Sequence, residues 1–268
     1  MSRIKERFAR RKHPLFIGFL VAGDPDFSHS LIAARAMADG GVDVLEIGLP
    51  FSDPVADGPA IQHAHERALQ AGMTTDRVFA LVKAVREQTG IPIVLFSYYN
   101  LVFSRGTDRF FADARAAGAD GILIVDLPVE EYDDAARAGS RHGIDTILLV
   151  APTTSPERRK RIYARTGGFV YLISLEGVTG ARARLPEHVA GLLASVRAET
   201  ALPVAVGFGI SRPGQVRDVC RAGADGVIVG SAFADIIGRH TADEDGLREE
   251  LMRYIAEMRA ALPARGEG

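Results

Sequence analysis

The sequence contains a single cysteine, Cys220, among its 268 residues. A lone thiol excludes an internal disulfide and is typical of proteins kept in a reducing compartment. No apolar run reaches the roughly 18–20 residues that a membrane-spanning helix needs, and no signal-peptide pattern opens the chain. From these absences we expect a cytoplasmic protein that has no membrane segment.

Several motifs that would assign a class of function are also missing. The histidines are scattered and form no metal-ligand pattern. His63 and His65 are two residues apart on a predicted helix and do not share a face, so we interpret them as surface or packing residues. There is no G-x-S-x-G elbow of a hydrolase, and no G-x-G-x-x-G dinucleotide motif follows the first predicted strand. A net charge of −2 provides no general basic field, so we expect neither a metal centre nor a nucleic-acid partner.

Short apolar runs alternate with longer amphipathic segments along the chain, and 47% of the residues are hydrophobic. The predicted strands cover residues 15–21, 42–47, 91–96, 121–125, 146–150, 169–173, 203–206 and 227–229. The predicted helices cover residues 28–39, 76–87, 108–117, 130–142, 156–165, 186–199, 213–222 and 247–262. This alternation predicts an α/β fold, a single (β/α)8 TIM barrel over residues 1–268. An open doubly wound sheet is the alternative.

The two ends of the chain lie outside this alternation. Residues 1–12 are predicted to form an extra N-terminal helix, and the segment RIKERFARRKH at 3–13, which overlaps it, is locally basic. We interpret its basic residues as a solvated helix face, with Ile4 and Phe8 turned toward the core. Residues 263–268 are predicted to be a disordered tail.

One short pattern recurs four times, as a glycine, an aspartate two residues later and then an apolar strand. The copies begin at Gly41, Gly118, Gly143 and Gly223. Glycine suits a helix C-cap, so the pattern is typical of the turn from a helix into a barrel strand. Five residues after its glycine the first copy has Glu46, whereas the others have Leu123, Leu148 and Ile228. A carboxylate is costly to bury at a core position, which indicates a functional acid.

The segment that follows Glu46 adds further carboxylates. Residues 48–60 contain Asp53 and Asp57, together with prolines and glycines that rule out both helix and strand. In a barrel this loop lies at the C-terminal face, where active sites are built, and so does the predicted mobile lid at 174–185. An acid on a strand and a second carboxylate on the next loop are an arrangement that acid–base chemistry can use.

Two glycine-bearing segments follow the last two predicted strands. They are Gly207-Phe-Gly-Ile-Ser211 and Gly230-Ser-Ala232. Barrel enzymes commonly bind phosphate at these strand ends, where backbone N–H groups and a helix N-terminus face the anion. Ser231 is predicted to cap a helix at 232–238 and to donate to the phosphate. The two segments together predict a phosphate-bearing ligand without identifying it.

Six segments, in order along the chain, resemble the tryptophan synthase α subunit. They are Phe19-Leu-Val-Ala-Gly-Asp-Pro25, Leu45-Glu-Ile-Gly-Leu-Pro-Phe-Ser-Asp-Pro-Val-Ala-Asp-Gly-Pro59, Tyr98-Tyr-Asn-Leu101, Asp126-Leu-Pro-Val129, Gly177-Val-Thr-Gly180 and Gly207-Phe-Gly-Ile-Ser211. The second is highly specific for this family. The resemblance runs from about residue 4 to the last predicted helix. It implies a lyase that cleaves indole-3-glycerol phosphate to indole and glyceraldehyde 3-phosphate.

The resemblance also implies roles for individual residues. Glu46 would be the general acid and base, which protonates C3 of the indole and handles the proton of the glycerol hydroxyl. Asp57 would accept the indole N–H and stabilise the positive charge of the protonated ring. The other substrate contacts would come from Phe19, Tyr98, Leu123, Tyr171, Thr179 and Phe208. The phosphate contacts would come from Gly180, Gly209, Gly230 and Ser231.

The partner implied by the resemblance is a pyridoxal-phosphate β subunit in an α2β2 heterotetramer. This subunit would receive the indole and complete L-tryptophan, with Asp53 and Pro54 at the interface. The α chain itself would need no cofactor. The alternatives are a stand-alone lyase that releases free indole and a non-catalytic activator of the β subunit; the presence of both Glu46 and Asp57 argues against the second. Another phosphate-binding barrel would not explain the loop at 52–59.

Overall fold

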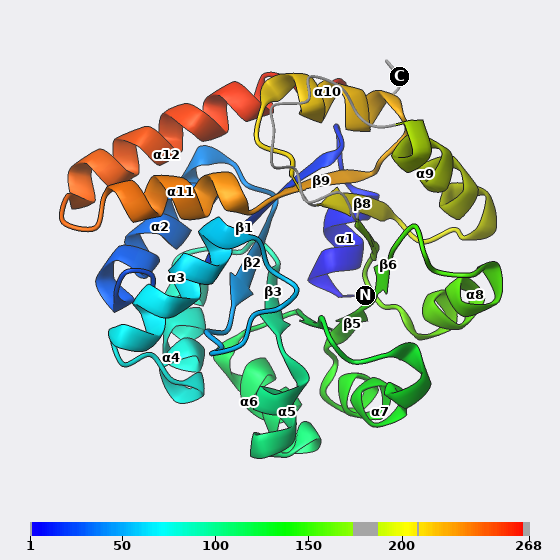
Figure 1. The fold of residues 1–268 in the computed structure, drawn as a ribbon, viewed down its shortest axis with the longest axis horizontal. Helices are drawn as coiled ribbons and strands as arrows, with labels where there is room; N and C mark the ends of the chain where they lie inside the picture. The colour runs from blue at the N-terminus through cyan, green and yellow to red at the C-terminus, as the bar shows by residue number, and fades with distance from the viewer. Residues whose placement is uncertain (1, 174–186, 208, 265–268) are drawn as a thin grey trace.

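The computed structural model describes residues 2–173, 187–207 and 209–264 (Figure 1). The predicted lid at 174–185, the site residues Thr179, Gly180 and Phe208, and most of the predicted tail at 263–268 lie outside the described residues. Within the described ranges, no helix is long and apolar enough to cross a membrane.

The described strands form one parallel sheet in the order β5-β4-β3-β2-β1-β9-β8-β7-β6 (Figure 1). Its two outermost strands, β5 (Asp145–Ile147) and β6 (Leu149–Val150), are separated in the chain only by Leu148. They are therefore two halves of one strand, and the sheet closes on itself. The carbonyl of Leu148 accepts the amide of Tyr171 at 3.1 Å, which continues the pairing with β7 across the break. The predicted TIM barrel is confirmed.

The remaining strands agree with the predicted ones to within two residues at each end. They are β1 (Leu15–Val21), β2 (Val44–Gly48), β3 (Ile93–Ser97), β4 (Gly121–Ile124), β7 (Val170–Ile173), β8 (Val204–Gly207) and β9 (Gly226–Val229). Every residue of β1 and β2 is buried. Helices cover the outer face of the sheet and side chains fill the inner one, so the strands lack the alternating pattern of a half-exposed sheet.

The helices do not alternate strictly with the strands, and this part of the prediction is wrong. They are α1 (Arg3–Ala9), α2 (Phe27–Gly40), α3 (Pro59–Gln70), α4 (Thr75–Arg86), α5 (Tyr99–Arg105), α6 (Thr107–Ala117), α7 (Asp133–His142), α8 (Pro156–Arg165), α9 (Glu187–Glu199), α10 (Pro213–Arg221), α11 (Ser231–Arg239), α12 (Glu244–Arg259) and the 3-10 helix η1 (Val129–Glu131). Two α-helices follow each of β2, β3 and β9. The break between α5 and α6 falls at Gly106, whose φ of 85° favours glycine.

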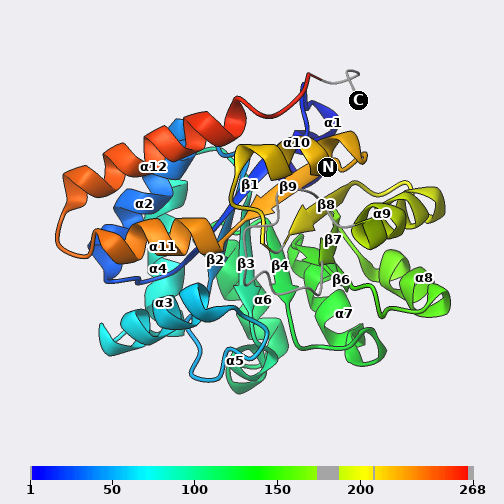
Figure 2. The same cartoon turned by 45° about the horizontal axis from the view of Figure 1, so that its top comes forward.

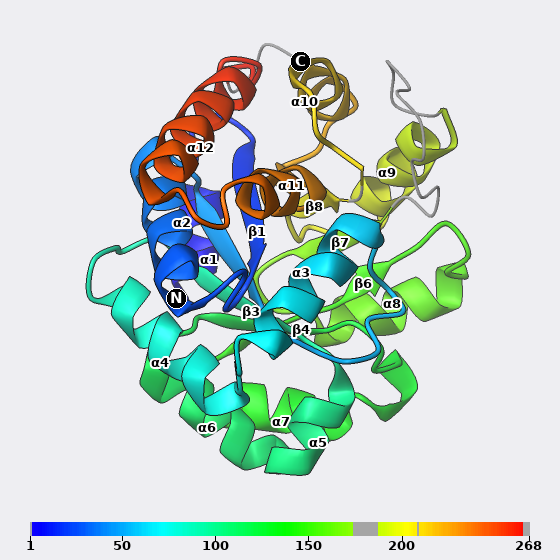
Figure 3. The same cartoon turned by 60° about the vertical axis from the view of Figure 1, so that its left-hand side comes forward.

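The helices after β9 return to the beginning of the chain. Figures 2 and 3 show α12 lying along α2, and α11 beside α3. The stripe of α12 that faces inward consists of Leu247, Leu251, Ile255 and Met258, all buried as the sequence pattern predicts. The last helices therefore cover the first β/α units, and the segments that follow β1, β2 and β9 lie close together.

Helix α1 lies across the end of the barrel where the strands begin (Figure 1). Ile4 and Phe8 are 0% and 1% exposed, as predicted, and the ring of Phe8 lies 5.4 Å from that of Phe169. These apolar contacts close the floor of the barrel and leave the opposite end, where the strands finish, for other side chains.

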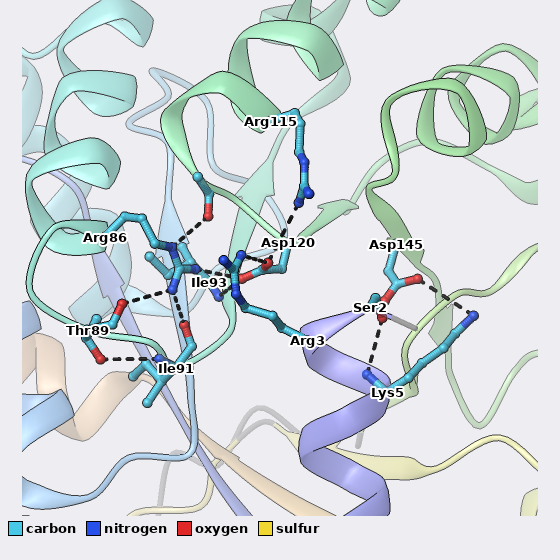
Figure 4. A network of polar contacts seen from close by, with 11 residues as sticks. Ser2, Arg3, Lys5, Arg86, Thr89, Ile91, Ile93, Arg115, Asp120 and Asp145 are labelled. Carbon is cyan, nitrogen blue, oxygen red and sulfur yellow. Dashed lines mark hydrogen bonds and ion pairs between the residues drawn. The ribbon is translucent and has the colours of Figure 1, made fainter.

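The basic residues of the N-terminal segment are not simply solvated, which corrects the prediction. Four of them bind an aspartate that stands third in one copy of the repeat: Arg3 pairs with Asp120, Lys5 with Asp145, Arg7 with Asp43 and Arg11 with Asp225. Figure 4 shows the first two pairs, together with Arg86, which also binds Asp120. The repeat is therefore a ring of acidic positions at the strand starts that receives the N-terminal segment.

Candidate active site

Glu46 is at the middle of β2, paired in register with Phe19 of β1 and Val94 of β3. Its side chain is 0% exposed, and neither carboxyl oxygen has a hydrogen-bond partner among the described residues. The equivalent residues of the repeat, Leu123, Leu148 and Ile228, are all buried aliphatics. The acid therefore occupies a position that the fold otherwise gives to the core.

This environment determines the protonation of Glu46. Burial without a compensating charge raises the pKa of its carboxyl from 4.5 to about 8. A carboxylic acid with a pKa near neutrality can both give and take a proton under physiological conditions. Such perturbed groups in a barrel interior are candidates for catalysis.

Asp57 lies on the loop between β2 and α3, immediately before the helix N-cap at Gly58. It is 9% exposed, and the hydroxyl of Tyr98 donates to its Oδ2 at 2.7 Å. The amide of Ala56 donates to the same hydroxyl at 3.1 Å, and the ring of Phe51 stacks on Tyr98 at 4.7 Å. Tyr98 thus fixes the inner side of this loop at the point where it presents Asp57.

Tyr171 lies close enough to both carboxylates to feel their charges. It lies on β7 and is 5% exposed, and burial followed by the charges of Glu46 and Asp57 raises the pKa of its hydroxyl well above 10. A Cβ atom at Gly207 would stand 2.5 Å from this hydroxyl, so glycine is required there. The structure therefore brings Glu46, Asp57, Tyr98 and Tyr171 together at one end of the barrel.

Apolar side chains line the same interior. Phe19 is 4% exposed and meets Phe96 edge-on at 5.5 Å between ring centroids. Leu123 is 0% exposed and is paired in register with Phe96. A Cβ atom at Gly230 would stand 3.3 Å from Phe19, so the end of β9 approaches this ring closely. The third predicted apolar contact, Phe208, lies outside the described residues.

The predicted phosphate segments lie at the ends of β8 and β9, and hydrogen bonds fix the first of them. Gly209 has a φ of 79°, a conformation that favours glycine. The side chain of Gln215 accepts from the amides of Ser211 and Arg212 at 2.9 and 3.0 Å and donates to the carbonyl of Gly209 at 3.2 Å. Gly230 is the N-cap of α11 and Ser231 its first residue, which corrects the prediction that Ser231 caps this helix. The serine side chain is thus not committed to a capping bond.

Comparison with known proteins agrees with this geometry. The family model described as tryptophan synthase alpha chain matches residues 6–263. The chain belongs to the tryptophan synthase alpha chain family. The tryptophan synthase alpha chain of Methanoregula boonei is 49% identical over 97% of this chain and 98% of its own, and that of Methanothermobacter thermautotrophicus is 51% identical over 97% and 95%. A chain of the tryptophan synthase a2b2 complex from Pyrococcus furiosus superposes with a TM-score of 0.88 at 41% identity, covering 93% of this chain and 99% of that chain.

The residues that the tryptophan synthase resemblance assigns to a subunit interface lie on the outer side of the same loop. Asp53 is exposed and accepts the hydroxyl of Ser52 at 2.5 Å, and Pro54 is partly exposed. The neighbouring Val55 is 84% exposed, although it is apolar. The loop therefore has one face toward the barrel, through Asp57, and one toward solvent.

For one residue of the site, His65, the sequence left open whether it lies at the surface or is packed inside. His65 is not a surface residue: it is 1% exposed, and its Nε2 lies 3.4 Å from Oδ2 of Asp57. The spacing of His63 and His65 on α3 says nothing about this contact, because Asp57 lies on the loop before the helix. No sequence spacing indicates this contact, because it depends on how the loop at 51–57 folds back onto α3.

Proposed function

We propose that the chain is the lyase of a tryptophan synthase, which cleaves indole-3-glycerol phosphate to indole and glyceraldehyde 3-phosphate. The observation that carries the proposal is the buried carboxyl of Glu46 inside a barrel, which has no partner among the described residues, together with Asp57 on the loop that follows the same strand. The same arrangement belongs to a chain whose relatives are tryptophan synthase alpha chains over nearly their full length.

Glu46 acts first as an acid. Its neutral carboxyl gives a proton to C3 of the indole ring, and this makes C3 tetrahedral and places positive charge on the ring nitrogen. The carboxylate left behind then takes the proton of the hydroxyl next to the scissile bond. As the carbon–carbon bond breaks, its electron pair returns to the ring, so that indole and an aldehyde leave and Glu46 is protonated again. A pKa near 8 supports both roles, because one group must be acid and base in a single turnover.

Asp57 acts on the opposite part of the ring. An ionised carboxylate that accepts the ring N–H stabilises the charge that develops on nitrogen when C3 is protonated. The hydrogen bond from Tyr98 fixes the direction of the Asp57 carboxylate. Two carboxyl groups in contrasting environments, one unpaired and one hydrogen-bonded, thus take different parts in the reaction.

The remaining groups orient the substrate. Phe19, Leu123 and Phe208 flank the indole, while the backbone of Gly180, Gly209, Gly230 and Ser231 binds the phosphate. Tyr171 supports Glu46 from β7, and Thr179 hydrogen-bonds Asp57. The free N–H groups at the start of α11 support this placement, because a helix N-terminus favours an anion.

The chain works with a β subunit to which it passes the indole, and it carries no cofactor of its own. The exposed apolar side chain of Val55, next to Asp53 and Pro54, supports an interface on this loop, because a partner that covers this side chain would remove it from water. The function of the loop is thus divided between catalysis and association.

The experiment is to incubate the purified chain with indole-3-glycerol phosphate and to measure indole and glyceraldehyde 3-phosphate, with and without a tryptophan synthase β subunit. We expect both products in equal amounts, and faster release when the β subunit is present. Rapid indole release that the β subunit does not change would indicate a stand-alone lyase. No indole under either condition would refute the proposed function.

A further inference from the structure

His65 is a buried polar residue beside Asp57 that the proposed mechanism does not use. It lies on α3, and the backbone amide of Phe51 donates to its Nδ1 at 3.2 Å. A backbone amide can only donate, so Nδ1 is the unprotonated nitrogen of the ring. The proton of the neutral imidazole therefore sits on Nε2, on the side of Asp57.

The N–H at Nε2 lacks a hydrogen-bond partner among the described residues, and Oδ2 of Asp57 is 3.4 Å away. A buried donor without an acceptor is costly, so a slight approach of the two groups would be favourable. Hydrogen bonds in active sites are often long before the substrate binds and shorten in the complex. The geometry is that of a contact ready to form.

Both contacts that the described residues make with the Asp57 carboxylate, from Tyr98 and from His65, fall on Oδ2. Oδ1 is then the oxygen that remains to accept a substrate N–H. His65 also holds the amide of Phe51, so a single ring connects the start of the 51–57 loop to its end. Displacing the ring would release the amide of Phe51 and remove the donor that faces Asp57.

We propose that His65 is a positioning residue, whose Nε2–H holds Oδ2 of Asp57 so that Oδ1 meets the indole N–H. The inference rests on the proposed function. Asparagine is the informative replacement, because its side-chain oxygen can take the place of Nδ1 and accept from Phe51 but its amide is too short to reach Asp57. His63, which is exposed on the same helix, provides the matched control.

The test is a double-mutant cycle on indole release from indole-3-glycerol phosphate, with wild type, His65→Asn, Asp57→Asn and the double variant. We expect His65→Asn to lower kcat about tenfold, as a misdirected catalytic group does, and to change KM less than twofold. On the Asp57→Asn background it should cause no further loss. His63→Asn should keep wild-type kcat, and His65→Gln, whose amide nitrogen can replace Nε2, should recover most of the lost activity.

A kcat loss of the same factor with and without the Asp57 carboxylate would overturn the inference, because it would show a purely structural role. Wild-type kcat in His65→Asn would overturn it as well. If His65→Asn does not fold, as judged by its thermal unfolding curve, the cycle is run with His65→Ala, which also lacks the donor toward Asp57, and the same two criteria apply. Failure of wild type to release indole would instead refute the proposed function, so the two failures are distinguishable.

Discussion

The buried side chain of Glu46 carries both a cost in stability and the proposed acid–base chemistry. Its carboxyl is fully buried and unpaired among the described residues, so the fold keeps it protonated at the expense of stability at higher pH. Core positions of this fold otherwise hold apolar side chains, and a functional group is a common reason for an exception. The cost of burying this carboxyl can be measured as a dependence of the unfolding free energy on pH.

Glu46→Gln should stabilise the protein at alkaline pH relative to wild type. Below pH 4.5 the carboxyl is protonated in both states, and its ionisation contributes nothing to the difference. Between pH 4.5 and about 8 it ionises in the unfolded chain but not in the folded one, which favours unfolding progressively as the pH rises. The difference in unfolding free energy between the two proteins should therefore change by up to about 5 kcal/mol across this window. Urea titrations at pH 5, 7 and 9 measure it, and a pH-independent difference would contradict the pKa.

Tyr98→Phe should weaken the loop that carries Asp57. The variant keeps the stacking on Phe51 but removes the hydroxyl that donates to Asp57 and accepts from Ala56. We expect a loss of about 1–3 kcal/mol of stability and a fall in kcat of about tenfold. Tyr99→Phe, at the neighbouring and less buried position, is the control. Equal kcat values for the two variants would argue against a role of Tyr98 in directing Asp57.

At this scale the sequence predicts some residues and not others. Glu46 could be identified because three copies of the repeat show what the position normally holds. His65 could not, because its role depends on how the 51–57 loop folds back onto α3. No periodicity within a helix contains that information, since it concerns the path of an irregular segment.

At the scale of elements, the aspartates of the glycine–aspartate repeat connect strands that are distant in the sequence, which the repeat itself does not indicate. Asp43, Asp120 and Asp225 each accept an amide of a neighbouring strand, from Phe16, Ile93 and Val204 at 2.8, 3.0 and 2.9 Å. Each also binds an arginine of the N-terminal segment. The same carboxylate therefore joins two strands and fastens α1 to both of them.

Removal of such an aspartate should cost more than removal of its partner on α1. Asp120 is 2% exposed and binds Arg3, Arg86 and the amide of Ile93, so Asp120→Ala leaves the largely buried guanidinium of Arg86 without this counter-charge and the amide without its acceptor. We expect about 3 kcal/mol of destabilisation. Arg3→Ala should cost less than about 1 kcal/mol, because that side chain is 48% exposed. Denaturant unfolding compares the two, with Arg109→Ala, at 74% exposure, as a surface control; equal losses for Asp120 and Arg3 would contradict this account.

Elements with a strong period were predicted well, and those that depend on local breaks were not. The strands and α12 follow from apolar patterning, which reflects burial directly. The pairing of α5 with α6 depends on the left-handed backbone at Gly106, and a glycine in a sequence does not reveal its φ. The solvated interpretation of the basic N-terminal segment failed because its partners are up to 214 residues away.

At the scale of the whole molecule, the two ends of the barrel have separate tasks. The strand starts carry ion pairs and the packed floor of α1, whereas Glu46 lies within the barrel on β2 and Asp57 lies on the loop that follows this strand. This division is typical of TIM barrels, in which residues at the strand ends can change without disturbing the floor. It also means that stability and catalysis can be tested by independent substitutions.

The central claim is that the neutral carboxyl of Glu46 protonates the indole ring. Its most direct test is the pH dependence of kcat/KM for indole release by wild type and by Glu46→Gln. We predict that the wild-type value falls as the pH rises through about 8, where the acid ionises. The glutamine variant should be at least ~10²-fold slower and show no such fall. Undiminished cleavage by Glu46→Gln, or the same alkaline fall in both proteins, would contradict the mechanism.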